Sequence, residues 1–148
     1  MANPFDLHTI LLAKHAQHVV LIHFPIALFA AGVAFDLLSG GKPESSWTAA
    51  AYFNLTAAAL TAIPAIITGL LAWQFALDGK RLRGLLLLHL LFAVSTLILM
   101  WFSCWTHRRA RKSKPFALPR HRIAIEVLGV FAIALTTHLG GFLSGVNL

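Results

Sequence analysis

Four long stretches of apolar residues, separated by short polar segments, dominate the pattern of this chain of 148 residues. A membrane-spanning helix needs about 20 predominantly apolar residues. Each stretch is long enough, and the pattern predicts spanning helices over residues 17–38, 47–77, 84–105 and 122–145. Short connections make successive spans antiparallel neighbours. The sequence therefore predicts an all-α polytopic membrane protein, a four-transmembrane-helix up-down bundle, and its two halves show no sequence repeat.

The first 16 residues precede these stretches and have a different pattern. Asn3 can cap a helix that starts at Pro4, and the apolar positions that follow have helical spacing. We expect residues 1–16 to form a short interfacial helix at the membrane surface and residues 17–148 to form the transmembrane domain. The N-terminus lacks the basic region of a secretory signal, so we expect it to be retained.

The composition supports a membrane protein and excludes several other classes. Hydrophobic residues make up 58% of the chain and charged residues only 11%, against about a quarter charged in a soluble domain. Cys104 is the only cysteine, so no disulfide forms within the chain, and no CxxCH motif for covalent haem is present. The net charge is +7, but it is concentrated near one loop. We therefore expect a lipid bilayer as partner and no nucleic acid.

Lysine and arginine are distributed unevenly between the two ends of the predicted bundle. The end that contains loop 106–121 would hold eight of them and the other end four. Basic residues collect on the cytoplasmic side of membrane proteins. This distribution predicts that loop 106–121 is cytoplasmic and that both termini lie outside.

Three of the four predicted spans contain a histidine within the apolar run, namely His23, His89 and His138, and His18 stands at the start of the first span. A polar group without a partner in hydrocarbon costs several kcal/mol, so these imidazoles need partners. A rise of about 1.5 Å per residue places the three at roughly 7–10 Å from the outer end. Each shares a helix face with small or polar residues, which favours an inward orientation.

Several roles are open to inward-facing histidines at one depth. Two of His23, His89 and His138, with His18 as a reserve ligand, could hold the iron of haem b from both faces. The same three could bind Zn or Cu, or they could relay protons. Alternatively, the imidazoles only form hydrogen bonds to backbone carbonyls or to residues such as Thr136.

The acidic residues of the spans give a weaker signal. Asp36 and Glu126 lie near the predicted inner ends of the first and fourth spans, where Arg108, Arg109 or Arg122 could pair with them. Solvation at the interface is the expected account. No nucleophile–base pair, phosphate loop or carboxylate dyad occurs, so we do not expect an enzyme that acts alone.

The chain resembles a bacterial four-helix membrane family, domain-of-unknown-function family 2231. The matching stretches are HVVLIHFPIALFAAGVAFDLL, LLLLHLLFAV and THLGGFLSGVNL. The family's motif positions correspond to His18, His23, Pro25, Asp36, His89, Gly140 and Gly141. The resemblance implies the topology, the place of a site and a bacterial inner membrane, and it leaves the chemistry open.

Our leading hypothesis from the sequence is a small b-type-cytochrome-like membrane subunit. It would bind haem b through its inward histidines and pass electrons at the outer face, beside a larger membrane redox complex. The alternatives are a non-catalytic structural subunit of a larger complex and a histidine site for Zn or Cu.

Overall fold

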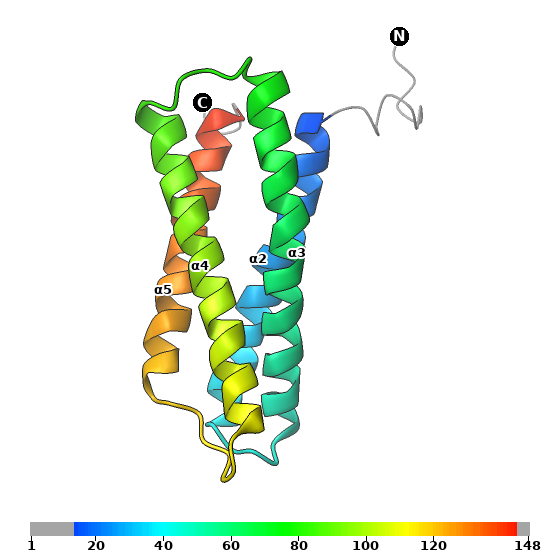
Figure 1. Cartoon of the computed structure of the whole chain (residues 1–148), viewed down its shortest axis with the longest axis vertical. Coiled ribbons are helices and arrows are strands. Elements are labelled where there is room, and N and C mark those ends of the chain that lie inside the picture. Colours follow the sequence, from blue (N-terminus) through cyan, green and yellow to red (C-terminus); the bar gives the residue numbers. More distant parts are fainter. Residues whose placement is uncertain (1–13, 145–148) are drawn as a thin grey trace.

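The computed structural model describes residues 14–144, and within them the side chains of residues 17–75 and 77–144. Four helices run in up-down order, as Figure 1 shows: α2 (Lys14–Ser39), α3 (Ser46–Ala76), α4 (Gly84–Lys112) and α5 (His121–Leu143). All four are long and apolar enough to cross a membrane. The predicted all-α four-helix membrane bundle is therefore confirmed. The interfacial helix predicted for residues 1–16 lies mostly outside the described residues.

The helices end where the sequence supplies caps or turns. The Ser39 hydroxyl donates to the Asp36 carbonyl and accepts from the Gly41 amide, which closes α2. Gly40 and Gly41 have φ of +57° and +74°, a left-handed backbone that glycine adopts without a Cβ penalty. Ser45 caps α3 by accepting from the amide of Trp47. The chain therefore reverses within six residues.

Helix α4 continues seven residues beyond the predicted end at residue 105. Residues 106–112 are polar and basic, so they mark where the membrane-compatible surface ends. They include arginine, alanine and lysine, which are good helix formers, and the backbone therefore stays helical. This extension places His107 inside α4.

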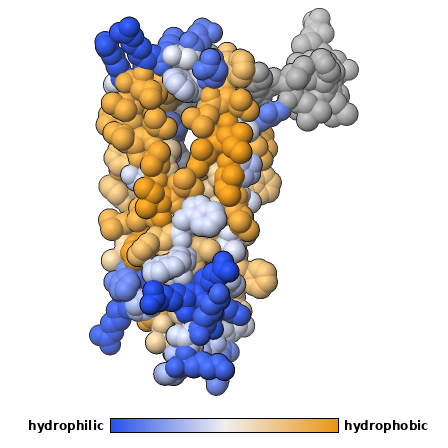
Figure 2. All heavy atoms as spheres, in the orientation of Figure 1, coloured by the Kyte–Doolittle hydropathy of each residue, from blue (hydrophilic) through white to orange (hydrophobic). Residues whose placement is uncertain are grey.

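The bundle has two chemically different ends. We call the end with loops 40–45 and 113–120 the basic end, and the end where α2 begins and α5 finishes the terminal end. Figure 2 shows an apolar band between hydrophilic ends on the face in view. Large apolar side chains point outward, including Phe53 (74% exposed) and Phe131 (61% exposed). A soluble monomer rarely exposes so much apolar surface, so this surface suits contact with lipid.

The buried core lies in the half of the bundle nearer the basic end. Its members are Phe29, Val33, Leu55, Ala58, Ala62, Met100 and Ile133. Glycines bring the helices close together there: a Cβ on Gly129 would lie 2.7 Å from the Phe29 ring, and one on Gly32 would lie 2.8 Å from Leu55 Cγ. Close backbone approach at small residues is a main source of packing energy between membrane helices.

The α2–α3 and α4–α5 hairpins follow one burial pattern at an offset of 71 residues, the separation of His18 and His89. The buried positions of α2 (Pro25, Phe29, Gly32, Val33, Asp36 and Ser39) correspond to Thr96, Met100, Ser103, Cys104, His107 and Ala110, all buried in α4. Four buried positions of α3 (Ala51, Leu55, Ala58 and Ala62) correspond to Arg122, Glu126, Gly129 and Ile133, all buried in α5. The two halves share this burial pattern although, as predicted, they show no sequence repeat.

Candidate functional site

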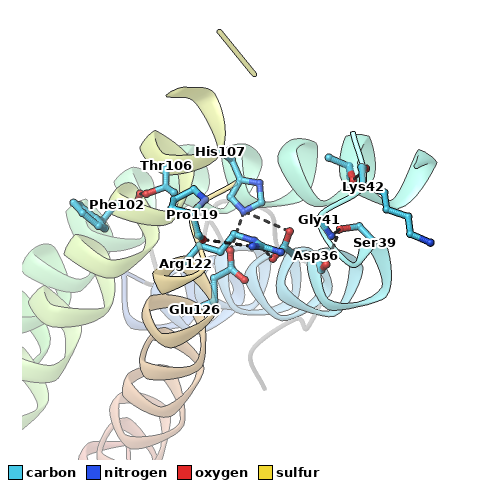
Figure 3. A network of polar contacts seen from close by, with 11 residues as sticks. Asp36, Ser39, Gly41, Lys42, Phe102, Thr106, His107, Pro119, Arg122 and Glu126 are labelled. Atoms are coloured by element: carbon cyan, nitrogen blue, oxygen red, sulfur yellow. Dashed lines mark hydrogen bonds and ion pairs between the residues drawn. The ribbon is translucent and has the colours of Figure 1, made fainter. Parts of the chain in front are cut away.

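Four ionisable side chains meet at the basic end, and we call them the polar centre: Asp36, His107, Arg122 and Glu126. Their exposed fractions are 0%, 2%, 6% and 0%. Figure 3 shows them converging from three helices. Asp36 comes from the last turns of α2, His107 from the extension of α4, and Arg122 and Glu126 from the first turns of α5. Residues four apart on a helix share a face, so Arg122 and Glu126 point into one space.

Arg122 and Asp36 form a buried ion pair between the two hairpins. Arg122 Nε donates to Asp36 Oδ2 at 2.7 Å, and Nη1 donates to the Pro119 carbonyl at 3.4 Å. The guanidinium also lies against Gly41, where a Cβ would be 3.3 Å from Nη2. The absence of a side chain at Gly41 therefore leaves room for Arg122. Arg122 in turn fixes the position of the Asp36 carboxylate.

His107 lies between the two carboxylates. Its Nε2 donates to Glu126 Oε1 at 2.9 Å and is 3.8 Å from Asp36 Oδ1. Asp36, His107 and Glu126 each offer one ligand atom, and these atoms all lie within 4.8 Å of one another. Within residues 17–75 and 77–144, this is the only group of three or more His, Cys, Asp or Glu side chains with that spacing.

Two carboxylate oxygens of the polar centre have no hydrogen-bond partner in the structure, Asp36 Oδ1 and Glu126 Oε2. The Ser103 hydroxyl, one turn before His107 on the same helix, is also buried without a hydrogen bond. Buried polar atoms are nearly always hydrogen-bonded, and an unsatisfied one costs about 1–3 kcal/mol, more if charged. Unsatisfied carboxylate oxygens beside an imidazole form a set of donors suited to a cation.

A comparison with models of protein families identifies the family of the chain. The profile of the family described as "Predicted membrane protein (DUF2231)" matches residues 14–146. The chain belongs to the DUF2231 family. No curated protein and no solved structure matches it. For this DUF2231 protein, membership therefore supports a place in the lipid bilayer and leaves its activity open.

His18 and His89 occupy corresponding places in the two hairpins, near the terminal end. Nδ1 of His18 donates to the Ala65 carbonyl of α3, and Nδ1 of His89 donates to the Thr136 carbonyl of α5, each at 3.0 Å. Each ring also lies over a glycine of the neighbouring helix, where a Cβ would approach Cε1 to 2.9 Å for His18 and 3.2 Å for His89. The two histidines therefore connect the two helices of their own hairpins.

His23 and His138 are placed differently from the predicted inward orientation. His23 is exposed, and its Nδ1 donates at 2.6 Å to the Val19 carbonyl of its own helix. His138 is exposed and packs edge-on against Phe142 at a centroid distance of 5.0 Å. The small residues that share a face with His23, among them Ala27, are exposed too, because α2 packs through the face that carries Phe29. His23, His89 and His138 do not bring their ring nitrogens into one group of ligand atoms in the described structure.

The polar centre was only partly visible in the sequence. The sequence offered the pairing of Asp36 with Arg122 as one of three possible arginine partners, and the structure contains that pair. The expectation that the acidic side chains are solvated at the interface is wrong, because Asp36, Arg122 and Glu126 are buried. His107 is absent from the sequence-based candidates, because the predicted third span ends at residue 105 and His107 falls in the predicted loop. The signal was helical spacing: Ser103, His107 and Ala110 continue the buried face of α4.

Proposed function

We propose that this DUF2231 protein binds a divalent first-row transition-metal ion at the polar centre, through Asp36, His107 and Glu126. The observation that supports the proposal most is the pair of buried carboxylate oxygens without hydrogen bonds. Asp36 Oδ1 lies 3.8 Å from His107 Nε2, and Glu126 Oε2 belongs to the carboxylate whose Oε1 contacts that nitrogen. The protein would be a metal-binding membrane subunit, and its ion would link the first hairpin to the second.

Two of the three donor distances are close to those that one ion needs, and all the ligand atoms lie within 4.8 Å of one another. Two ligand atoms at about 2.1 Å from a metal lie roughly 3.0–3.4 Å apart in octahedral or tetrahedral geometry. The distances from His107 Nε2 to the two carboxylates are 2.9 and 3.8 Å, on either side of that range. The donor set of two carboxylates and one imidazole suits Zn²⁺, Mn²⁺ or Fe²⁺ and not Cu⁺, which prefers sulfur ligands.

Arg122 would orient a ligand rather than compete with the ion. It holds Oδ2 of Asp36, so that Oδ1 stays directed at His107. With both carboxylates ionised and His107 neutral, the formal charge of the polar centre would be −1. Binding of the ion would require the other neutral tautomer of His107, in which the ring proton lies on Nδ1 and the Nε2 lone pair is available to the metal.

Metal titration of the purified protein tests this proposal. The protein, carrying an affinity tag without histidine and stripped with EDTA, is titrated with Zn²⁺ by calorimetry, and bound metal is counted by mass spectrometry. We expect one ion per chain in the wild type. His107→Gln and Glu126→Gln should each weaken binding at least tenfold, because an amide can keep the hydrogen bond but is a poor zinc ligand.

The histidines of the terminal end supply matched controls. His89→Gln, and the double variant His23→Gln with His138→Gln, should retain one ion. Unchanged binding in His107→Gln would refute the proposal. Loss of binding in the control variants instead would assign the ion to His23, His89 and His138, which is the histidine metal site predicted from the sequence.

A second candidate function, haem b binding with electron transfer at the outer face beside a larger redox complex, has one observation in its favour. His18 and His89 are held at corresponding positions by equivalent Nδ1 hydrogen bonds. Haem-ligating histidines are commonly oriented in this way by a hydrogen bond from the other ring nitrogen. The same contacts also fit the structural alternative, in which the imidazoles only satisfy backbone carbonyls.

Absorption spectra separate these two possibilities. Protein reconstituted with haem b should give a Soret band that shifts on reduction, and His89→Ala should abolish it while His107→Gln leaves it intact. If His89→Ala leaves the Soret band unchanged, His89 does not ligate haem and the haem assignment is refuted. For both candidates we place the protein in a bacterial inner membrane with both termini outside, as the concentration of basic residues at the basic end favours.

A further inference from the structure

The last two turns of α4 carry a basic cavity at the edge of the apolar surface. The cavity is an open surface depression with a volume of about 420 Å³, lined by Trp105, Arg108, Arg109 and Lys112. Figure 2 shows a hydrophilic cluster over this end of the bundle, directly beside the apolar band. All four lining side chains are exposed. The cavity belongs neither to the polar centre nor to the histidine contacts of the terminal end.

No acidic side chain among residues 17–75 and 77–144 forms an ion pair with the cations of this cavity. In that part of the chain, the ion pairs involve Asp36, His107, Arg122 and Glu126 and none of the cavity residues. Arg109 instead lies over the Trp105 ring, 5.3 Å from its centroid. The carboxyl end of a helix is equivalent to about half a negative charge, which a single cation would balance. The three cations of the cavity therefore leave an excess of positive charge that attracts an anion.

The surface next to the cavity indicates which anion it is. Going back along the same face of α4, the exposed side chains become apolar: Trp105 is followed by Phe102 and Trp101 and then by Ile98, which is 60% exposed. Phe102 packs on Trp105 with ring centroids 5.4 Å apart. A single helix face therefore offers cations at the membrane surface and an apolar strip below them. A free phosphate would use only the upper part of this face.

We infer that this face binds an anionic phospholipid, with its phosphate among Arg108, Arg109 and Lys112, its glycerol region against Trp105, and an acyl chain along Phe102 and Ile98. Tryptophan and basic residues at the membrane–water boundary favour such a contact. Each cation near an anionic bilayer strengthens binding about fivefold. Three cations can therefore select an anionic lipid over a zwitterionic one by about a hundredfold.

Native mass spectrometry of the full-length protein in detergent tests the inference. Phosphatidylglycerol and phosphatidylcholine are added separately, and the bound fraction is measured against lipid concentration. We expect the wild type to bind phosphatidylglycerol at least tenfold more tightly. The variant R108Q/R109Q/K112Q should bind phosphatidylglycerol at least tenfold more weakly than the wild type. Trp105→Leu keeps every charge and should weaken binding by a smaller factor.

The control removes three charges from the same end without touching the cavity. Lys42, Lys114 and Arg120 are all exposed there, so K42Q/K114Q/R120Q should bind phosphatidylglycerol within about twofold of the wild type. Equal losses in the two triple variants would show a diffuse surface charge and overturn the inference, as would equal binding of the two lipids by the wild type. Displacement of the lipid by millimolar glycerol phosphate would also overturn it, in favour of a soluble anion. Circular dichroism confirms that each variant is folded.

Discussion

Replacing Arg122 by methionine should destabilise the bundle more than any other single change in the polar centre. The substitution leaves two buried carboxylates, Asp36 and Glu126, with ligand oxygens within 4.8 Å of each other and only His107 between them. Removing one partner of a buried ion pair costs about 3–5 kcal/mol. Asp36→Asn should cost less, because Arg122 can then turn to Glu126 on the same face of α5.

The only cysteine of the chain provides the assay. Cys104 is buried, 8% exposed, on the helix that carries His107, so a thiol reagent labels it only when the bundle opens. When closing is faster than labelling, the labelling rate follows the population of the open state. A loss of about 3–5 kcal/mol therefore accelerates labelling by roughly two to four orders of magnitude, at 1.4 kcal/mol per factor of ten.

The double variant Asp36→Leu with Arg122→Met supplies the control. Removing both partners together leaves neither charge of the pair buried alone, and replacement of a buried pair by apolar residues is often close to neutral. We expect labelling within about tenfold of the wild type. The reasoning would be refuted if Arg122→Met were labelled as slowly as the wild type, or if the double variant were labelled as fast as Arg122→Met.

Two further predictions concern the close approach of helices at glycine. Gly129→Ala should lower thermal stability, because overpacking against the buried Phe29 ring costs about 1–3 kcal/mol and exceeds the gain of up to about 1 kcal/mol in helix propensity. Adding Phe29→Leu to Gly129→Ala should restore part of the lost thermal stability, and a double variant no more stable than Gly129→Ala would contradict the packing argument. Gly69→Ala should destabilise more than Gly140→Ala, because the added Cβ would lie 2.9 Å from the His18 ring and 3.2 Å from the His89 ring. A lower unfolding temperature for Gly140→Ala than for Gly69→Ala would contradict this prediction.

The spans could be predicted from the sequence because lipid imposes a single requirement along their whole length. About 20 apolar residues in a row have few other structural solutions, so four helices and their order followed directly. Which face of a helix is buried could not be predicted in the same way. When lipid and protein interior are equally apolar, the hydrophobic pattern does not distinguish them. The alanine face with His23 therefore suggested an interface that α2 does not form.

The polar centre was hidden for a different reason. Asp36, His107 and Glu126 each lie close to a predicted membrane boundary, where a charged side chain is ordinarily solvated. Only the tertiary structure shows that three helices bury all of them at once. His89 was recognised because it interrupts an apolar run, whereas His107 follows polar and aromatic residues and does not stand out locally.

The shared burial pattern of the two hairpins has a consequence for the composition of the polar centre. Asp36 and His107 occupy equivalent positions, as do Leu55 and Glu126, and Ala51 and Arg122. A symmetric pair of first hairpins would place two aspartates opposite each other with no cation, whereas a pair of second hairpins would bring two arginines and two glutamates together without an aspartate. The pairing of Asp36 with Arg122, and the meeting of His107 with two different carboxylates, therefore require that the two halves of the chain differ at these equivalent positions.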